Sequence, residues 1–225
     1  LALEEPWFLN RRVAAGFELF REKSDYYSSY YDELRAGFEL YFRKRLFELV
    51  EGRLFYRLED VVIDDISDAA STSIPWLKAE DLTISKLGFS LTRDTRDSIL
   101  FPSEGSIVTL RKEFAGGPFG GDADYGRVEL QGARFFKTFD AMEQVVTISG
   151  RTGTLGRFDG DPADVPFFEK FFLGGPYNLR GWDYREAGPQ DPIASEPSGG
   201  NSYSYLSAEY TFRVADPLRF AFFYD

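Results

Sequence analysis

The chain contains repeated segments in which apolar and polar residues alternate with a period of two. The clearest is residues 33–43, where Leu34, Ala36, Phe38, Leu40 and Phe42 fall on one face and Arg35, Glu39 and Arg43 on the other. Successive side chains of a strand point to opposite faces, whereas a helix of this sequence would mix the two sets around its circumference. The pattern therefore predicts a β-strand with one apolar face and one charged face.

The same alternation recurs along the chain and predicts an all-β protein. The other clear segments are 12–22, 50–59, 127–131, 146–151, 206–213 and 218–225. Several approach the roughly 9–11 residues with which a tilted strand crosses a bilayer, whereas strands of soluble proteins commonly have about 5–6. We count about nine strands and predict an antiparallel transmembrane β-barrel, of which this chain is a part.

The connections between these strands are predicted to alternate between short and long. Short turns are expected near 44–45, 102–105, 139–141 and 215–217, and long loops at about 60–80, 116–124 and 159–201. Short turns at one end and long loops at the other are typical of outer-membrane barrels. Residues 1–225 are expected to form one partial barrel domain, because an odd number of strands cannot close a barrel by the usual rules.

The aromatic content supports a membrane barrel. Phe, Tyr and Trp make up 17% of the 225 residues, and such barrels use aromatic side chains at both water–lipid boundaries. The sequence contains no run of about 18 apolar residues that a transmembrane helix would need. On composition alone, an aromatic-rich soluble sandwich or a lipocalin-like barrel stays open.

The residue types that are absent argue against an enzyme, a cofactor and a metal site. There is no cysteine and no histidine, which removes the usual nucleophile, general base and transition-metal ligands. The net charge of −11 argues against a nucleic-acid partner. Asp94, Asp97, Asp122 and Asp124 match no calcium-loop spacing. We expect Asp94, Arg96 and Asp97 to form a charge network at a strand end, and Asp122 and Asp124 to solvate a loop tip.

The longest loop contains the segment G-G-P-Y-N-L-R-G-W. Its distinctive residues are Gly174, Gly175, Leu179, Arg180, Gly181 and Trp182. The segment resembles the signature loop of the BamA superfamily of outer-membrane insertases and transporters, in which a G-G-x-x-x-(V/L)-R-G-(F/Y/W) element folds back into the barrel lumen. Residues 88–105, 113–125 and 166–175 resemble neighbouring family elements in the same order, whereas the first eighty residues fit only by pattern.

The resemblance implies a role for Arg180. In this family the loop arginine pairs with acids on the inner wall, which correspond here to Glu209 and Asp225. The alternation independently assigns both acids to the polar face, and a guanidinium offers a planar fork of donors that suits two carboxylates. A latch that only stabilises the fold and an element required for function remain equally open interpretations.

The resemblance also implies a function and a location. It implies the barrel portion of an assembly factor that inserts β-barrel proteins into the bacterial outer membrane at a weakly paired seam, which this segment is expected to lack. The implied partners are outer-membrane lipid, unfolded β-barrel clients and periplasmic accessory lipoproteins. A TamA-like factor or a two-partner-secretion transporter is the nearest alternative, and a passive porin or receptor barrel is an alternative of another class.

Overall fold

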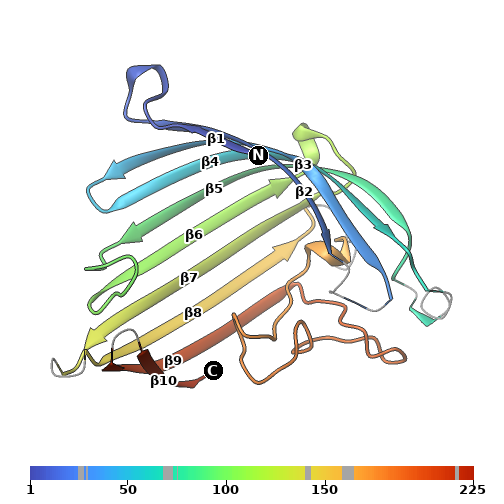
Figure 1. Cartoon of the computed structure of the whole chain (residues 1–225). Helices are drawn as coiled ribbons and strands as arrows, with labels where there is room; N and C mark the ends of the chain where they lie inside the picture. The colour runs from blue at the N-terminus through green and yellow to red at the C-terminus, as the bar shows by residue number, and fades with distance from the viewer. Residues whose placement is uncertain are drawn as a thin grey trace.

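The computed structural model describes residues 1–24, 28, 30–67, 73–74, 76–139, 143–158, 165–215 and 218–225, and these form one antiparallel sheet (Figure 1). Its ten strands are β1 (Ala2–Glu5), β2 (Ala14–Ser24), β3 (Asp32–Phe47), β4 (Val50–Asp64), β5 (Glu80–Asp94), β6 (Gly105–Ala115), β7 (Tyr125–Lys137), β8 (Val145–Gly156), β9 (Ser202–Ala215) and β10 (Leu218–Tyr224). The 3-10 helices are η1 (Phe8–Asn10), η2 (Gly117–Phe119) and η4 (Phe167–Glu169). No helix in the described ranges is long and apolar enough to cross a membrane.

The predicted all-β antiparallel fold is confirmed, with three differences in detail. The sheet has ten strands and not nine, because β1 is too short to show an alternating pattern. The turn predicted near 44–45 is wrong, since β3 continues through an irregular pairing near Arg45 to Phe47. The loop predicted from residue 60 begins later, because Val61 and Ile63 continue β4 and are buried. The turns predicted at 139–141 and 215–217 extend outside the described residues.

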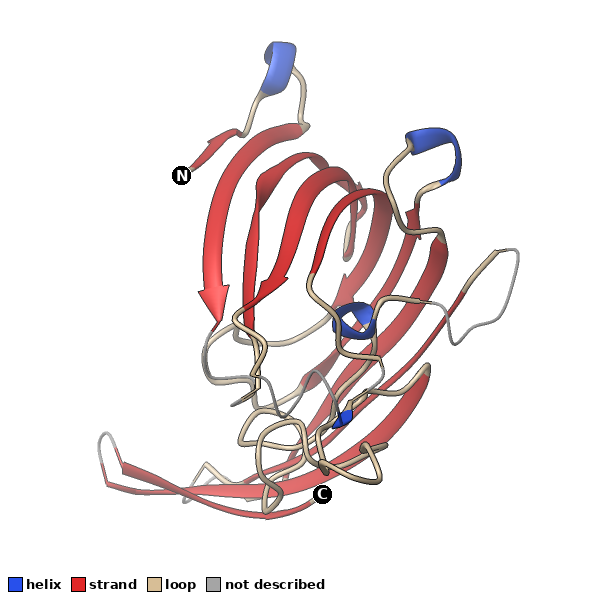
Figure 2. Ribbon diagram, turned by 90° about the vertical axis from the view of Figure 1, so that its right-hand side faces the viewer, coloured by secondary structure: helices blue, strands red, loops and turns tan. Residues whose placement is uncertain are grey.

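The sheet curls so that one face is concave (Figure 2). Within the described residues β1 and β10 are not paired with each other, so the curl does not close. The two longest connections, 65–79 and 157–201, lie at the same end of the strands. The predicted asymmetry between short turns and long loops therefore holds for these two loops. It is wrong between β5 and β6, because the turn predicted at 102–105 is part of a connection over 95–104 that is longer than the loop 116–124.

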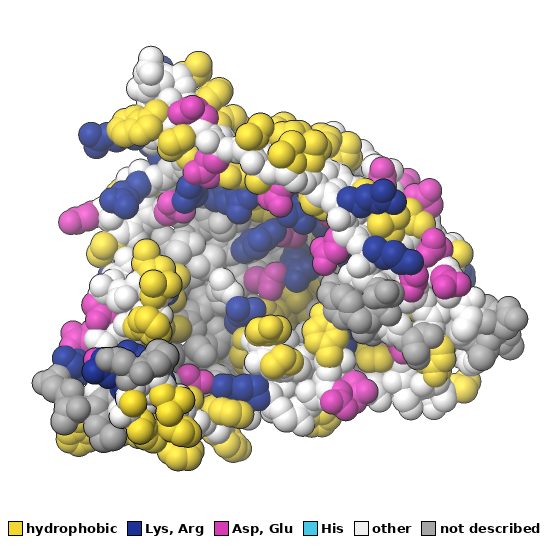
Figure 3. Space-filling view, viewed as in Figure 1, with side chains coloured by type: hydrophobic (Ala, Val, Ile, Leu, Met, Phe, Trp, Pro, Cys, Tyr) yellow, Lys and Arg dark blue, Asp and Glu magenta, His cyan; other side chains and the backbone are white. Residues whose placement is uncertain are grey.

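The two faces of the sheet differ in chemistry, as the alternation predicted. Large apolar side chains such as Leu54, Leu130, Leu206 and Phe222 are exposed on the outer face, Leu206 at 74% of its area. Charged side chains gather in the hollow of the concave face (Figure 3). This is the arrangement of a wall with lipid outside and water inside.

A buried apolar cluster fills the concave side near the end that carries the long loops. It joins strand residues such as Val61, Ile84 and Tyr125 to the loop residues Phe167 and Phe171. Because these aromatic side chains pack on β4, β5 and β7, the beginning of the long loop is fixed against the inner wall. The core of the molecule therefore lies between this loop and the sheet.

Candidate functional site

The loop between β8 and β9 lies on the concave side of the sheet (Figures 1 and 2). Its chain turns at Gly174 and Gly175, which have φ values of +113° and +101°. A Cβ on Gly174 would lie 2.2 Å from the carbonyl oxygen of Asp183, so only glycine fits there. The Asn178 side chain closes the turn by accepting a 2.8 Å hydrogen bond from the backbone N–H of Gly174. This turn presents the next residues of the loop to the wall.

Arg180 contacts the inner wall at the last two strands. Its Nε and Nη2 donate to the two carboxylate oxygens of Asp225, each at 2.7 Å, and its Nη1 donates to Glu209 at 2.7 Å. Nη2 also donates to Ser207 at 3.0 Å, and the guanidinium carbon lies 3.6 Å from the ring centre of Phe223. We call Arg180, Ser207, Glu209 and Asp225 the arginine cluster.

In the arginine cluster one guanidinium pairs with two carboxylates, and these contacts are partly shielded from water. The Asp225 side chain is only 3% exposed, and that of Arg180 is 24% exposed. The hydrogen bonds with Asp225, and after them those with Glu209, raise the pKa of Arg180 above its ordinary value. A charged, bidentate pair of this kind fixes orientation as well as distance. The structure therefore brings together the three residues that the sequence singled out.

The other residues of the loop motif have different surroundings. Gly181 has φ of +91°, and a Cβ there would meet nothing within 4 Å. Trp182 is 57% exposed, and its backbone carbonyl accepts from the N–H of Gly175 at 3.0 Å. Leu179 is half-buried, and its N–H donates to Asn178. Within this motif, the side chain that holds the loop to the wall is that of Arg180.

The charge network predicted at the end of β5 is only half right. Asp94 and Arg96 form an ion pair at 2.7 Å. Asp97 does not join them, because it accepts from the hydroxyl and N–H of Ser103 and from the N–H of Glu104. These bonds, led by that of the Ser103 hydroxyl, lower the pKa of Asp97. A short carboxylate in a turn satisfies nearby backbone donors more readily than it reaches a neighbouring arginine.

The two acids predicted to solvate a loop tip bind the backbone instead. Asp122 accepts from the N–H of Thr83 at 2.8 Å, and Asp124 accepts from the N–H of Gly117 at 2.5 Å. Asp122 thus ties the loop between β6 and β7 to the beginning of β5, and Asp124 closes the loop on itself. Among the described residues no group of three or more metal-ligating side chains gathers in one place.

A second cluster of charges was not predicted from the sequence. Glu169 in η4 is 3% exposed. It accepts from Arg35 at 3.0 Å, from Lys86 at 3.2 Å with both oxygens, and from the hydroxyl of Tyr125. We call these four residues the glutamate cluster. Its only signal in the sequence is a single acid inside the aromatic run P-F-F-E-K-F-F.

The glutamate cluster keeps its carboxylate ionised. Burial of Glu169 opposes ionisation, but attraction to Lys86 and then Arg35, together with the hydrogen bond from Tyr125, outweighs it and lowers the pKa of Glu169 to about 2. Lys86 also lies 2.6 Å from a carboxylate oxygen of the buried Glu59. The beginning of the loop is thus held by a dense set of opposite charges.

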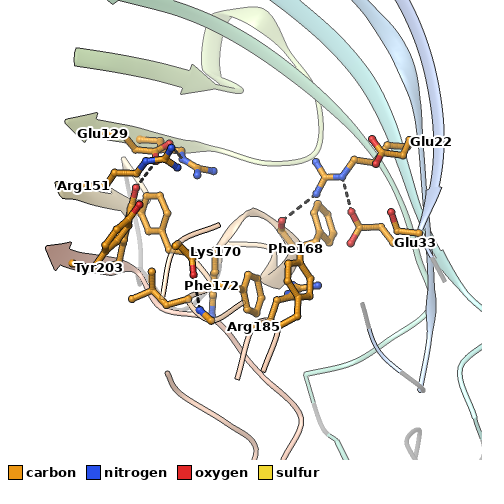
Figure 4. A pocket seen from close by; sticks show the side chains of 18 residues that line it. Glu22, Glu33, Glu129, Arg151, Phe168, Lys170, Phe172, Arg185 and Tyr203 are labelled. Atoms are coloured by element: carbon orange, nitrogen blue, oxygen red, sulfur yellow. Dashed lines mark hydrogen bonds and ion pairs between the residues drawn. The ribbon is translucent and has the colours of Figure 1, made fainter. Parts of the chain in front are cut away.

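A polar cavity of about 350 Å³ lies on the concave side of the sheet, with Arg35 of the glutamate cluster in its lining (Figure 4). Glu22 and Glu33 line one side, and Arg151, Lys170 and Tyr203 are among the residues of the other. Both signs of charge face the space, as expected of a water-filled interior. Nothing in this lining selects one small-molecule ligand.

The fold and the docked loop define the class of this protein as a transmembrane β-barrel with a loop folded inside. The sequence matches the Omp85 superfamily domain over residues 1–225, and the chain belongs to that superfamily. It is therefore a barrel portion, and its location is the bacterial outer membrane.

Relatives and a solved structure agree with this assignment. The chain is 32% identical over 155 residues to the outer membrane protein assembly factor BamA of Nitratidesulfovibrio vulgaris, covering 69% of this chain and 19% of that protein. It is 30% identical over 151 residues to a SAM50-like protein of Schizosaccharomyces pombe, covering 67% of this chain and 31% of that protein.

A crystal structure of BamA from Haemophilus ducreyi lacking POTRA domains 1–3 shares the fold, with a TM-score of 0.80 at 18% identity. The alignment covers 99% of this chain and 47% of that one. The chain thus spans less than half the length of these relatives.

Proposed function

We propose that this chain is the barrel portion of an assembly factor that folds β-barrel proteins and inserts them into the outer membrane. The bacterial relatives are named outer membrane protein assembly factors. The observation in this chain that carries the proposal is the docking of Arg180 on Asp225 and Glu209. A passive porin or receptor barrel gives no reason for the Gly-Gly and Arg-Gly element that builds this contact.

The arginine cluster would keep the loop inside the barrel while the wall changes. Glu209 belongs to β9 and Asp225 follows β10, so one guanidinium bridges two neighbouring strands. A client strand can add to a sheet edge by backbone hydrogen bonds, and in lipid such pairing is strongly favoured. A loop tied to the wall from inside would hold the strands in place during that exchange.

The proposed partners follow from the two faces and the two ends of the sheet. The apolar outer face would contact outer-membrane lipid, and unfolded β-barrel proteins would be the clients. Periplasmic accessory lipoproteins would bind at the end with the short turns. We further propose that the chain has no enzymatic activity and needs no cofactor, because it contains neither histidine nor cysteine.

A second candidate within the same superfamily fits the arginine cluster equally well. A TamA-like factor or a two-partner-secretion transporter would also carry a loop arginine docked on the inner wall. The number of periplasmic domains in the full-length protein discriminates between these branches, since it differs among them.

The test is to replace Arg180 in the full-length protein. Purified protein in lipid vesicles would be given an unfolded client barrel, and insertion would be followed by the heat-modifiable gel mobility of the client. We expect Arg180→Ala to lower the insertion rate strongly and Arg180→Lys to give an intermediate rate, because lysine keeps the charge and loses the planar fork.

Arg45→Ala is the matched control, since Arg45 is exposed near the β3–β4 turn and lies far along the strand from the loop. Insertion by Arg180→Ala at the wild-type rate would contradict the proposal.

A further inference from the structure

The long loop is held to the wall at two places that carry opposite charges. At Arg180 a loop cation meets wall acids, whereas at Glu169 a loop acid meets the wall groups Arg35, Lys86 and Tyr125. The two contacts use different strands, with Glu169 on β3, β5 and β7 and Arg180 beside β9 and β10. The loop segment from Glu169 to Arg180 is therefore paired to the wall at both of its ends.

The main chain around Glu169 is fixed as well. Arg35 donates from Nη2 to the carbonyl of Phe168 at 3.0 Å, and Arg127 donates to the carbonyl of Glu169 at 3.4 Å. Polar groups of three strands, β3, β5 and β7, thus contact η4. Phe167 and Phe168 add apolar packing and lie mostly buried.

Packing alone would not require a carboxylate at this position. The neighbouring aromatic residues already bury the segment, and a buried ion pair commonly adds little net stability over an apolar side chain of similar volume. A buried charge instead disfavours other positions of the loop, because a shifted loop would leave the charge unpaired. Because Glu169 meets basic wall groups and Arg180 meets acidic ones, a loop that shifted along the wall would move each charge away from its partners.

We propose that Glu169 is a positioning residue that sets where the loop docks on the inner wall, so that Arg180 reaches Asp225 and Glu209. The residue acts through Arg180 and not on a client directly. The role of Glu169 in docking the loop does not depend on the proposed function, whereas its effect on client insertion rests on that function.

Glu169→Gln is the main variant. It removes the charge while keeping the size, and the wall stays compensated, because Lys86 still pairs with Glu59 at 2.6 Å and Arg35 with Glu33 at 2.6 Å. Tyr125→Phe is a milder second variant that removes one donor to Glu169 and keeps the ring. Glu186→Gln is the matched control, since Glu186 is an exposed acid on the same loop.

The loop position is measured in the full-length protein by pulsed electron resonance between nitroxides at Tyr177 and Leu206. Both sites are exposed, at 91% and 74%, and the chain supplies no cysteine of its own within these 225 residues. We expect one narrow distance distribution for the parent and for Glu186→Gln. Glu169→Gln should lower the docked population relative to undocked states about tenfold, and Tyr125→Phe should shift it less in the same direction.

Client insertion then tests whether Glu169 acts through Arg180. The double variant with Arg180→Ala should insert clients no more slowly than Arg180→Ala alone, since both changes undo one contact. A parent-like distance distribution in Glu169→Gln, or additive losses in the double variant, would overturn the inference. If the distribution broadens while Arg180→Ala inserts clients normally, the positioning role stands and the proposed function fails.

Discussion

Two parallel hydrogen bonds, each 2.7 Å long, join the guanidinium of Arg180 to the carboxylate of Asp225. The backbone N–H of Arg180 donates a third bond to the same carboxylate at 3.0 Å. Main chain and side chain of one loop residue therefore recognise one wall residue. Such a contact fixes the direction in which the loop passes the wall, not only its distance.

The two acids of the arginine cluster should contribute unequally to the stability of the docked loop. Asp225 accepts three bonds from Arg180 and is 3% exposed, whereas Glu209 accepts one and is 31% exposed. We expect Asp225→Asn to destabilise the docked loop by about 1.5–3 kcal/mol, in line with hydrogen bonds to charged groups, and Glu209→Gln by clearly less. The distance distribution of the spin-labelled loop measures both. Equal effects would show that the fork on Asp225 is not the main contact.

Replacing the loop glycines by alanine should lower stability by amounts that depend on the space around each glycine. Gly174→Ala would push a Cβ to 2.2 Å from a carbonyl oxygen, adding a clash to the backbone strain of about 1–3 kcal/mol. Gly181→Ala should show only the strain, because nothing lies within 4 Å. Gly156→Ala, at the end of β8 with equal room and an ordinary φ, is the control. Thermal midpoints should fall most for Gly174→Ala, and the reverse order would be incompatible with the loop geometry.

Neighbouring residues of β7 offer a test of the two-sided wall. Leu130 is 45% exposed on the outer face, whereas Gln131 faces inward opposite Arg151. Leu130→Glu should destabilise the barrel in lipid by up to about 2 kcal/mol, less than the cost of arginine or lysine on that face. Gln131→Glu should be neutral or slightly stabilising. Equilibrium unfolding in vesicles measures both, and a larger loss for Gln131→Glu would mean that the faces are reversed.

The loop should stay docked well into the acid range. An unfolded glutamate has a pKa near its ordinary 4.5, and Glu169 in the folded protein has a pKa of about 2. A lowered folded pKa gives stability that is fully present above pH 4.5 and is lost as the pH falls through 2. Wild-type stability minus that of Glu169→Gln should therefore be constant above about pH 5 and shrink below it. If this stability difference grew on acidification, it would contradict a lowered pKa of Glu169 in the folded protein.

Sequence reasoning worked best where a period or a short motif carried the information. The alternation in residues 33–43 placed Glu39 inside and Leu40 outside, and the structure agrees. The same alternation places Glu209 and Asp225 on the inner face, where both contact Arg180. The pairing of Arg180 with Glu209 and Asp225 was implied by the resemblance of the loop to a known family, and the alternation placed both acids on the face that Arg180 reaches. Ser207, the fourth member of the arginine cluster, was not predicted.

Glu169 was missed for a physical reason. Its partners Arg35, Lys86 and Tyr125 come from three strands far away in the sequence, and each looks like an ordinary residue of a polar face. Only the curl of the sheet brings them within 3.2 Å or less of one carboxylate. The prediction for Asp97 was wrong for a local reason, because its carboxylate accepts from Ser103 and Glu104 and not from the neighbouring Arg96.

The most direct test of the account is protease access to Arg180 in intact cells that express the full-length protein. Trypsin cuts after arginine, so a docked Arg180 should resist external trypsin, and Asp225→Asn should release the loop and raise cleavage at that bond about tenfold or more. Arg180 that is cut at the same high rate in both proteins would mean that the loop does not dock on the inner wall.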